Sequence, residues 1–544
     1  MLNAAAMESR LLSHSRAGPS GAREALAGPA PFRPYVRPLD KSSKRRSAQL
    51  EISATATAPA KVHSNGIQKT AQKKASAPEA PPKPEFTWSK NWYPVAVASL
   101  LEKDKPNKVT LLGRDYVVWY ADDMWNAAKD ECPHRFAALS VGRVEDGQLF
   151  CRYHGWGFKG GEEGRCSCNP QAVGAEAEAT VMNSSRSRLE TYPSQVEQGL
   201  LWLWPESGAD AWLEASNKPP VTTPEMQNPA FAGAQADFMF MENPASLQVM
   251  LENALDPSHA SYVHNLVISK RQDAAPMQMK LSSDITAQQG FTLDHGGYSK
   301  SQQEGNMKAK RYYIPPCTIR THYTYESGRE DITTLYLVPV APGVTRAYNK
   351  VVLKNVASRT KSIFNFLSKT VLSSGFFHAF GHGLVDQDMN VLHQQERKLA
   401  KKPHGWRDYY LATQSDTGVA SFWRWLDTFA GGDVQWSDGV SPDLPTERSI
   451  EDLKNHYDRH TKYCSACQKA IRRLDQISKG IVALSAALGG AAAFAVPASA
   501  GFGVFGLQVQ WRLLVGALAL ALLSLRGPVL SFRQRFFSAD DIIG

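Results

Sequence analysis

The chain is poor in cysteine, with seven in 544 residues. A secreted disulfide framework concentrates more cysteine in a much shorter chain, so that class of protein is excluded. The few thiols indicate a reducing compartment inside a cell or an organelle. Charged residues make up 21% and apolar residues 43% of the chain, as in folded soluble domains. A chain of this length is expected to form two or three domains with a large buried core.

The start of the chain is poor in acidic residues. Its first 80 residues contain 13 Lys and Arg but only 5 Asp and Glu, which accounts for +8 of the net charge of +9. The rest of the chain is nearly neutral, so the basic balance gives no indication of nucleic-acid binding. The same segment lacks the long apolar run of a secretion signal, and its Arg, Ser and Ala content is typical of an organellar transit peptide. We predict a disordered leader over residues 1–82, with a plain basic tail as the alternative.

Two short motifs combine cysteine with histidine: Cys132-x-His134 and, sixteen residues later, Cys151-x-x-His154. Loops that each supply one thiolate and one imidazole are typical of a Rieske [2Fe–2S] cluster, in which thiolates bind one iron and imidazoles the other. Two cysteines and two histidines can also bind zinc, but the C-x-H spacing and the contexts CPHR and YHGW are unlike a zinc finger. We therefore predict that these four side chains hold a Rieske cluster.

Short apolar runs rich in Val, Leu, Trp and Tyr alternate with turns around these motifs. The pattern predicts a small antiparallel β domain over residues 86–205, with the cluster at loop tips. A larger α+β domain is expected over residues 206–450, where the strand patterns DITTLYLVPVAP and TRAYNKVVLKN would form the wall of a cavity.

The segment MLENALDPSHASYVHN in the larger domain contains Asn253, Asp256, His259 and His264. Non-haem Fe(II) oxygenases bind iron with two histidines and one carboxylate on one face, and His259 and His264 would be the imidazoles. Two residues five apart point about 140° away from each other on an ideal helix. The helix must therefore widen into a π-type turn or bend between these histidines.

Asp256 stands directly before Pro257, and Asp-Pro is a common start of a helix, with Asp as the N-cap. Beside a Rieske cluster, a carboxylate three residues before His259 is also expected to orient the imidazoles and to couple the two metal centres. The two roles are compatible, and we assign Asp256 as a catalytic residue.

The carboxylate ligand of the iron must come from another part of the chain. The segment GHGLVDQDMNVLHQQERK offers Asp386 and Asp388. Either residue could also be an acid near the start of a helix, and spacing alone does not decide between them.

Cys464 and Cys467 form a C-x-x-C motif in a linker expected over residues 451–479. Such a motif can be a redox dithiol, half of a zinc site or a pair of inert thiols. No second pair of ligands lies nearby in the sequence, which favours a redox switch.

The sequence becomes apolar over residues 480–532. Residues 480–500 lack charge and are long enough to cross about 30 Å of hydrocarbon as a helix. A second apolar run lies between Arg512 and Arg526, whose long side chains can reach lipid headgroups. We predict a C-terminal transmembrane helical hairpin, and a hairpin buried in a soluble protein is the alternative.

The order of these features resembles that of the chloroplast Rieske oxygenases of the pheophorbide a oxygenase family, which includes the inner-envelope Tic translocon-associated oxygenase. The resemblance covers about residues 86–530 and rests on WYPV, CPHR…YHGW, LENALDPSH…H, QDMNVLHQQ and CSAC. It implies a Rieske domain joined to an oxygenase domain of helix-grip-like fold. By position, it implies cluster ligands Cys132, His134, Cys151 and His154 and iron ligands His259, His264 and, in preference to Asp386, Asp388.

The resemblance also implies a function. Reduced ferredoxin would supply electrons, and dioxygen would be used for ring-opening oxygenation of pheophorbide a, a chlorophyll-derived tetrapyrrole. Hydroxylation of a phyllobilin or of protochlorophyllide is one alternative, and a redox-sensing role in chloroplast protein import is another. A pure sensor would have no use for an iron site.

The resemblance further implies the surroundings of the enzyme. The C-terminal hairpin would anchor it in a chloroplast membrane, either the inner envelope or the thylakoid. A homotrimer is expected, in which Asp256 connects the cluster of one subunit to the iron of the next. Thioredoxin is the expected partner of Cys464 and Cys467.

Overall fold

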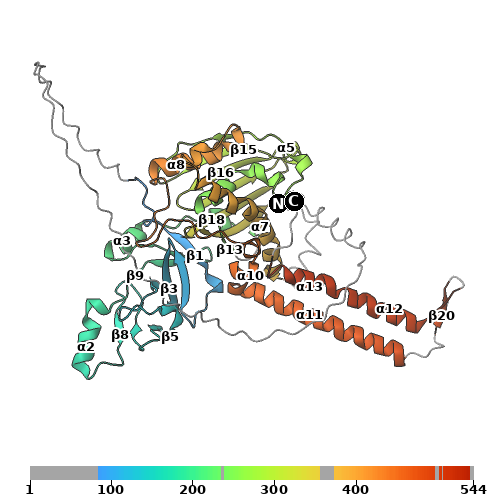
Figure 1. The fold of residues 1–544 in the computed structure, drawn as a ribbon, viewed down its shortest axis with the longest axis horizontal. Coiled ribbons are helices and arrows are strands. Elements are labelled where there is room, and N and C mark those ends of the chain that lie inside the picture. Colours follow the sequence, from blue (N-terminus) through green and yellow to red (C-terminus); the bar gives the residue numbers. More distant parts are fainter. Residues whose placement is uncertain (1–83, 234–237, 356–372, 496–500, 505–506, 539–544) are drawn as a thin grey trace, which may run out of the picture. The chain divides into compact units, whose positions relative to one another are not determined.

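The computed structural model describes residues 84–233, 238–355, 373–495, 501–504 and 507–538 (Figure 1). The predicted leader over residues 1–82 lies outside these residues. The described chain combines antiparallel sheets with helices, as the sequence predicts.

The N-terminal region consists of three small antiparallel sheets. In the first, the β2–β3 hairpin turns at Leu112 and Gly113, both with positive φ. The motif-bearing loops adjoin another of these sheets, one before its first strand, β5, and one after its second, β6. The elements are β2 (Asn107–Leu111), β3 (Arg114–Ala121), β4 (Met124–Lys129) and β9 (Thr191–Tyr192); β1 (Tyr93–Val97), β11 (Leu200–Leu203) and β10 (Ser194–Glu197); β5 (Arg143–Glu145), β6 (Gln148–Phe150), β7 (Gly157–Phe158) and β8 (Cys166–Cys168); with helices α2 (Ala175–Asn183) and α3 (Ala209–Asn217).

An eight-stranded antiparallel sheet forms the larger region, in the order β12-β19-β18-β17-β16-β15-β14, with β13 also paired to β19. The two segments predicted to line a cavity are its longest strands, β18 and β19. The strands are β12 (Ala232–Gly233), β13 (Met239–Asn243), β14 (Met279–Leu281), β15 (Phe291–Gly296), β16 (Lys308–Ile314), β17 (Thr318–Thr324), β18 (Glu330–Ala341) and β19 (Val344–Lys354).

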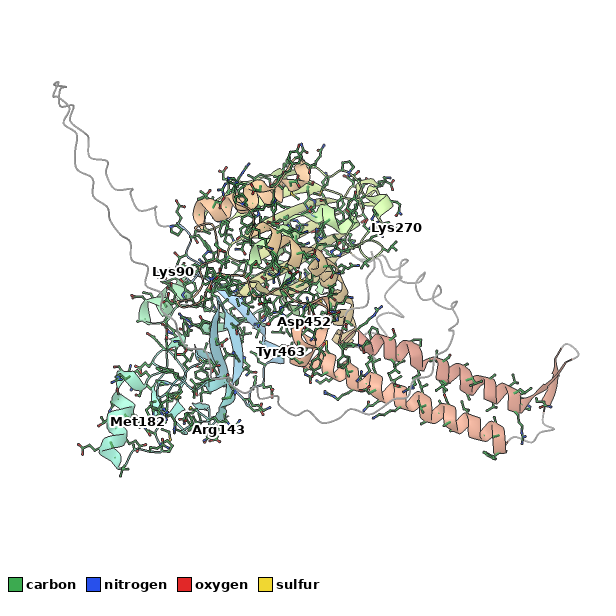
Figure 2. All side chains as sticks on the ribbon, viewed as in Figure 1. Lys90, Arg143, Met182, Lys270, Asp452 and Tyr463 are labelled. Carbon is green, nitrogen blue, oxygen red and sulfur yellow. The ribbon has the colours of Figure 1, made fainter. Side chains whose placement is uncertain are left out.

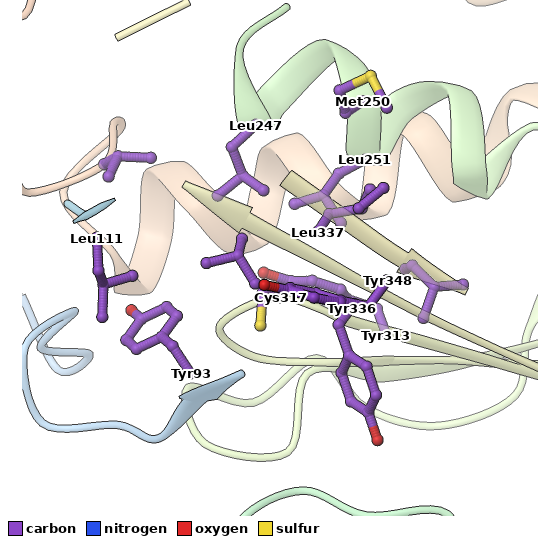
Figure 3. Close-up of a cluster of buried hydrophobic side chains, with 14 of the residues drawn as sticks. Tyr93, Leu111, Leu247, Met250, Leu251, Tyr313, Cys317, Tyr336, Leu337 and Tyr348 are labelled. Carbon is purple, nitrogen blue, oxygen red and sulfur yellow. The ribbon is translucent and has the colours of Figure 1, made fainter. Parts of the chain in front are cut away.

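Helix α4 packs on this sheet between α7 and α8. Leu247, Met250 and Leu251 recur at helical spacing on α4 and meet Tyr336 and Leu337 of β18 in a buried cluster (Figure 3). Burial of a leucine side chain stabilises the fold by about 1.5–3 kcal/mol, so this contact fixes the position of α4 firmly. The helices are α4 (Leu247–Leu255), α5 (Lys300–Glu304), α7 (Ser373–Leu399), α8 (Thr417–Phe429), α9 (Ile450–Leu453) and α10 (His456–Arg459).

Part of the N-terminal region shares a hydrophobic core with the larger region, while the sheet with the cysteine motifs packs in a separate cluster. Tyr93 and Leu111 of the N-terminal sheets lie in the same buried cluster as α4 and β18 (Figure 3). The β2–β3 turn also pairs with the end of β18, because Leu112 N–H donates to the Pro339 carbonyl at 2.9 Å. The boundary drawn at residue 205 from composition therefore separates two parts of a continuous core.

The C-terminal region is a pair of antiparallel helical segments connected through a short β-hairpin (Figure 1). The first segment begins just after Tyr463 (Figure 2). Residues 465–494 and 511–534 are long and apolar enough to cross a membrane, and only 22% and 6% of an apolar 18-residue stretch in each are buried. A core helix of a soluble protein would be mostly buried, whereas these two helices are mostly exposed. The elements are α11 (Ser465–Gly490), β20 (Gly501–Val504), β21 (Leu507–Gln510), α12 (Trp511–Ser524) and α13 (Arg526–Gln534).

Candidate active site

Two loops with the same backbone geometry present Cys132 and Cys151. In each loop the cysteine carbonyl accepts a hydrogen bond from the N–H four residues later, that of Phe136 at 2.8 Å and that of Gly155 at 3.0 Å. This fourth residue has a positive φ in both loops, 59° at Phe136 and 72° at Gly155. Glycine adopts this conformation freely, whereas phenylalanine pays about 1–2 kcal/mol for it. The shared geometry aligns the two C-x-H and C-x-x-H motifs.

The two cysteines of these motifs are buried, whereas the two histidines lie closer to the solvent. Cys132 and Cys151 are each 1% exposed, whereas His134 is exposed and His154 is half-buried. The two imidazole centroids are 4.7 Å apart, and Trp156 stacks on His134 at 4.8 Å. Two buried sulfurs opposite two outer imidazoles fit a Rieske [2Fe–2S] cluster whose imidazole side is open to an electron donor. Burial raises the pKa of Cys132 to about 12, so a bound metal rather than solvent would displace the proton.

The two histidines of the second predicted site follow the end of α4. Helix α4 stops at Leu255, and Pro257–Ser261 form a 3₁₀ helix that carries His259. Pro257 cannot continue the α-helix, because it has no N–H and its ring clashes with the preceding turn. The chain thus bends between α4 and His264, as the spacing of the histidines requires, but through a 3₁₀ turn rather than a π-type turn.

His259, His264 and Asp388 converge into what we call the iron group. Asp388 Oδ1 lies 3.6 Å from His259 Nε2 and 3.4 Å from His264 Nε2. Two ligand atoms on metal bonds of about 2.1 Å can be up to about 4.2 Å apart, so one ion fits between them. The donor set of two imidazoles and one carboxylate is the one that non-haem iron enzymes use.

Hydrogen bonds set both imidazoles in the same tautomer. His259 Nδ1–H donates to the carbonyl of Asp256, and His264 Nδ1–H donates to Gln387 Oε1 at 2.9 Å. The Nε2 lone pair of each ring is then directed at Asp388, which is the orientation a metal requires. We did not predict a role for Gln387 from the sequence, although it directly precedes the candidate ligand Asp388.

Burial disfavours the charged form of this group. It raises the pKa of Asp388 and lowers the pKa of His264. Asn253 Nδ2 donates to Asp388 Oδ1 at 3.1 Å, which partly offsets the burial of the carboxylate. A bound cation would supply the remaining compensation, because it favours an ionised carboxylate and neutral imidazoles.

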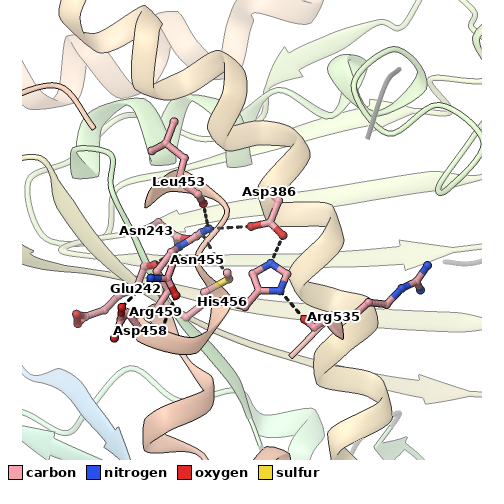
Figure 4. Close-up of polar contacts among 10 residues, drawn as sticks. Glu242, Asn243, Asp386, Leu453, Asn455, His456, Asp458, Arg459 and Arg535 are labelled. Carbon is pink, nitrogen blue, oxygen red and sulfur yellow. Dashed lines mark hydrogen bonds and ion pairs between the residues drawn. The ribbon is translucent and has the colours of Figure 1, made fainter. Parts of the chain in front are cut away.

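Asp386, the other candidate carboxylate, has other partners and is not part of the iron group (Figure 4). Its oxygens accept from Arg459 Nη1 at 2.8 Å and from His456 Nε2. Arg459 also donates to the carbonyl of Glu242 and to Asn243 Oδ1, both at 2.9 Å. Asp386 therefore ties α7 to α10 and β13, and Asp388 remains the proposed ligand.

Asp256 caps the 3₁₀ helix as predicted. Its Oδ1 accepts from Ser258 N at 2.9 Å and from the Ser258 hydroxyl. Its carbonyl orients His259, so Asp256 acts on that imidazole through the backbone. The side chain is half-buried and reaches the cavity beside the iron group.

Two cavities adjoin along α7. The first, of about 380 Å³, is lined by His259 and Asp388 of the iron group. The second, of about 460 Å³, shares Val391, Gln395 and Tyr409 with the first. The second cavity is also lined by two exposed lysines, Lys398 and Lys402.

Glu252 of α4 forms part of the wall of the first cavity and was not singled out from the sequence. Burial raises its pKa to about 7, although Trp423, Tyr409 and Gln395 all donate hydrogen bonds to it. A carboxyl group that titrates near neutral pH thus lies within this wall.

The C-x-x-C motif is part of a second cluster of metal-ligand side chains. His378, His460, Cys464 and Cys467 form what we call the His2Cys2 group, and all four are buried. The expectation that the cysteines lack a second pair of ligands is wrong, because His460 lies four residues before Cys464 and a distant histidine completes the pair. His378 comes from α7, 86 residues before Cys464.

A cluster domain, an iron group and an adjoining cavity define a Rieske non-haem iron oxygenase, with a [2Fe–2S] cluster and a mononuclear iron as cofactors. Enzymes of this class take electrons from a donor, use dioxygen and assemble into oligomers. The model of the Rieske [2Fe-2S] domain matches residues 91–193, and the model described as pheophorbide a oxygenase matches residues 313–406. The chain belongs to the pheophorbide a oxygenase family of chloroplast Rieske oxygenases.

Individual relatives agree with this assignment. Flavonoid 8-hydroxylase 2, chloroplastic, of Ocimum basilicum is 31% identical over 423 residues, which cover 74% of this chain and 77% of that protein. Pheophorbide a oxygenase, chloroplastic, of Oryza sativa subsp. japonica is 28% identical over 525 residues, which cover 91% and 92%. Among solved structures, dicamba monooxygenase bound to dicamba is similar over 63% of this chain and 98% of that one, at 18% identity and a TM-score of 0.48.

Proposed function

We propose that this protein performs the ring-opening oxygenation of a chlorophyll-derived tetrapyrrole acid, with pheophorbide a as the substrate and reduced ferredoxin as the electron donor. The pair of adjoining cavities carries this proposal. One end holds the iron group, and the other end holds Lys398 and Lys402 together with one acid, Asp408. Such a site suits a large, mainly apolar molecule with a carboxylate at one end, because apolar walls bind the ring and cations bind the acid. The match of the pheophorbide a oxygenase model to residues 313–406 supports the same choice.

In this proposal each metal has its own ligands. The cluster would be held by Cys132, His134, Cys151 and His154, and the iron by His259, His264 and Asp388. When bound on one face only, the iron supplies dioxygen activation beside the substrate. The chain contributes orientation, since the Asp256 carbonyl and the Gln387 amide hold the imidazoles. The cavity walls contribute exclusion of water from the reacting atoms.

Asp256 would also connect the two metal centres, and this requires a second subunit in a head-to-tail trimer. Its half-buried carboxylate lies next to the peptide that orients His259, so a partner's cluster ligand could bind it from outside. The exposed imidazole of His134 or the half-buried one of His154 is a suitable counterpart, because either can donate a hydrogen bond to a carboxylate.

The apolar helices suggest that the enzyme works at a plastid membrane, in the inner envelope or the thylakoid. The relatives are named as chloroplastic proteins. Residues 465–494 and 511–534 expose most of their apolar side chains, which a bilayer would cover. Tetrapyrroles partition into membranes, so this location would also bring the substrate to the cavity.

The lysines provide the test. Full-length protein in detergent, supplied with reduced ferredoxin and ¹⁸O₂, should convert pheophorbide a into a product that contains ¹⁸O. The double variant K398A/K402A should raise KM for pheophorbide a about tenfold, which corresponds to about 1.4 kcal/mol of lost binding, and should leave kcat unchanged. The KM for the propionate methyl ester should not change. K401A removes a neighbouring lysine that does not line the cavity and is the matched control.

Hydroxylation of a flavonoid is the second candidate, because flavonoid 8-hydroxylase 2 is a relative at 31% identity. A flavone lacks a carboxylate and fills only the cavity at the iron group, so K398A/K402A should not affect its turnover. Turnover of a flavone without turnover of pheophorbide a would replace the tetrapyrrole proposal. No oxygenated product from either substrate, while the cluster is reduced and reoxidised, would instead favour a redox-sensing role in protein import.

A further inference from the structure

The His2Cys2 group joins two segments that are far apart in the sequence, residue 378 and residues 460–467. His378 lies on α7, His460 directly follows α10, and Cys464 and Cys467 stand at the start of α11. Helices α7 and α11 approach so closely that a Cβ on Gly375 would lie 2.8 Å from the Cβ of Ala470. Packing of the helices thus brings the four ligand atoms together.

The distances between these atoms match a tetrahedral zinc site. His460 Nε2 lies 3.2 Å from His378 Nδ1 and 3.2 Å from Cys467 Sγ. His378 Nδ1 lies 3.5 Å from Cys464 Sγ and 3.4 Å from Cys467 Sγ. Tetrahedral zinc with bonds of about 2.0 Å to nitrogen and 2.3 Å to sulfur separates two nitrogens by about 3.3 Å and a nitrogen from a sulfur by about 3.5 Å. These four distances agree with the tetrahedral values to within a few tenths of an ångström, and all four ligand atoms lie within 4.8 Å of one another.

Burial and charge favour the same ligand. His460, Cys464 and Cys467 are 0% exposed and His378 is 2% exposed. Two thiolates and two neutral imidazoles neutralise a dication, so the complete site carries no net charge into the interior. Apolar side chains cover much of the group, with Phe240 against His460 and with Leu474 and Phe536 in the same cluster as the cysteines, while the buried ring of His382 packs on His460. Apolar surroundings exclude water and protect the metal from exchange.

We propose that His378, His460, Cys464 and Cys467 bind one structural Zn²⁺ that fastens the apolar C-terminal helices to α7. Four protein ligands leave no open position, so this zinc has a structural role. Because α7 also carries Asp388, ten residues or about 15 Å further along the helix, the zinc positions the helix that supplies the iron carboxylate.

This assignment replaces the redox switch favoured by the C-x-x-C motif alone. Thiol–disulfide exchange needs a sulfur that another thiolate can reach, and both sulfurs are enclosed. His382 shows that the cluster is selective. Its ring centroid is 4.2 Å from that of His460 and it is equally buried, yet its nitrogens are not among the converging ligand atoms.

The first test uses the wild-type, full-length protein, purified in detergent with both iron centres. Elemental analysis should find one zinc per chain in addition to the iron. X-ray absorption at the zinc edge should show two nitrogen neighbours at about 2.0 Å and two sulfur neighbours at about 2.3 Å. A preparation without zinc, a zinc bound only by nitrogen and oxygen, or iron in this site would overturn the proposal. So would a Cys464–Cys467 disulfide, detected by mass spectrometry without reductant.

The second test uses variants. C464S/C467S should lose the zinc and keep the iron and the Rieske electron paramagnetic resonance signal. C317S removes a thiol that is 1% exposed and lies outside the group, and should keep the zinc. H382Q is the matched histidine control and should keep it as well. Full zinc content in C464S/C467S would contradict the proposal, and the spectrum of the wild-type protein decides the matter if this variant fails to fold. Neither test depends on the identity of the substrate.

Discussion

Helix α7 supplies Asp388 to the iron group and, ten residues earlier, His378 to the His2Cys2 group, and the two groups differ in the number of ligands and in exposure to solvent. The iron group has three ligands and borders a cavity, and its His259 and Asp388 side chains are 20% and 12% exposed. The His2Cys2 group has four ligands, two of them sulfur, and is closed to solvent. An open position is needed to bind dioxygen, whereas a complete tetrahedron only holds segments together.

The spacing of residues along α7 produces this separation. His378, His382 and Asp386 recur every four residues and therefore share a face, which packs on α10 and α11. Asp388 is two residues beyond Asp386, about 200° around the helix, and so faces α4 and the cavity. One helix can thus link an anchor to an active site about 15 Å further along its axis.

The largest effect is expected from D388A, which removes the carboxylate of the iron group. The mononuclear iron should be lost and turnover should fall by far more than the tenfold to hundredfold typical of residues that only orient a ligand. The cluster and the zinc should remain. Iron content, the Rieske resonance signal and oxygen uptake check this.

D386N is the matched control for D388A. It breaks a buried ion pair with Arg459 and should destabilise the protein by about 3–5 kcal/mol, yet the iron should stay bound. Loss of iron in D386N with retention in D388A would exchange the roles of the two carboxylates.

The next effect is that of D256N. Asparagine is as good an N-cap as aspartate, so the 3₁₀ helix and the orientation of His259 should survive. Both metals should remain bound, whereas the electron should no longer reach the iron efficiently, and turnover should drop by about a hundredfold or more. Rapid-mixing spectroscopy of the reduced cluster should show slowed oxidation by dioxygen in the presence of substrate. An unchanged rate would limit Asp256 to capping.

Local patterns explain what could be predicted from the sequence. Cys132, His134, Cys151 and His154 lie on two adjacent loops, and His259 and His264 lie within one bend, so short spacings sufficed. The structure places Asp388 rather than Asp386 beside the histidines, because the two carboxylates point in different directions around α7. This choice could not be made before the segment was known to be helical. His378 could not be connected with Cys464 from the sequence, because only the packing of α7 on α11 brings them together. Glu252 had no signal, since its partners come from α7, α8 and the segment between them.

Burial of Glu252 in the wall of the cavity at the iron group makes the stability of the protein depend on pH, and the variant E252Q measures this dependence. Glu252 has a pKa of about 7 in the folded protein against an ordinary value of 4.5. Between these values the folded state holds a proton that the unfolded state has released, so stability should fall as the pH rises from about 4.5 to 7 and level off above. The loss is at most about 3 kcal/mol. Thermal unfolding of E252Q should lack this component, and an identical pH dependence in both proteins would show that another group titrates.

The smallest effect is expected from Q387L, which removes the acceptor for His264 Nδ1–H and leaves all three iron ligands in place. Without this hydrogen bond the ring can rotate and can change tautomer, so iron affinity should fall about tenfold to a hundredfold. The group should still bind iron at saturating metal, because the geometry of His259 and Asp388 is unaffected.

Q387E keeps an acceptor at this position and should restore affinity. Iron titration followed by oxygen uptake measures both variants, and equal affinity in Q387L and the wild type would mean that packing alone orients His264. Zinc content should be the same in all three proteins, because Gln387 lies on the side of α7 that faces away from the His2Cys2 group.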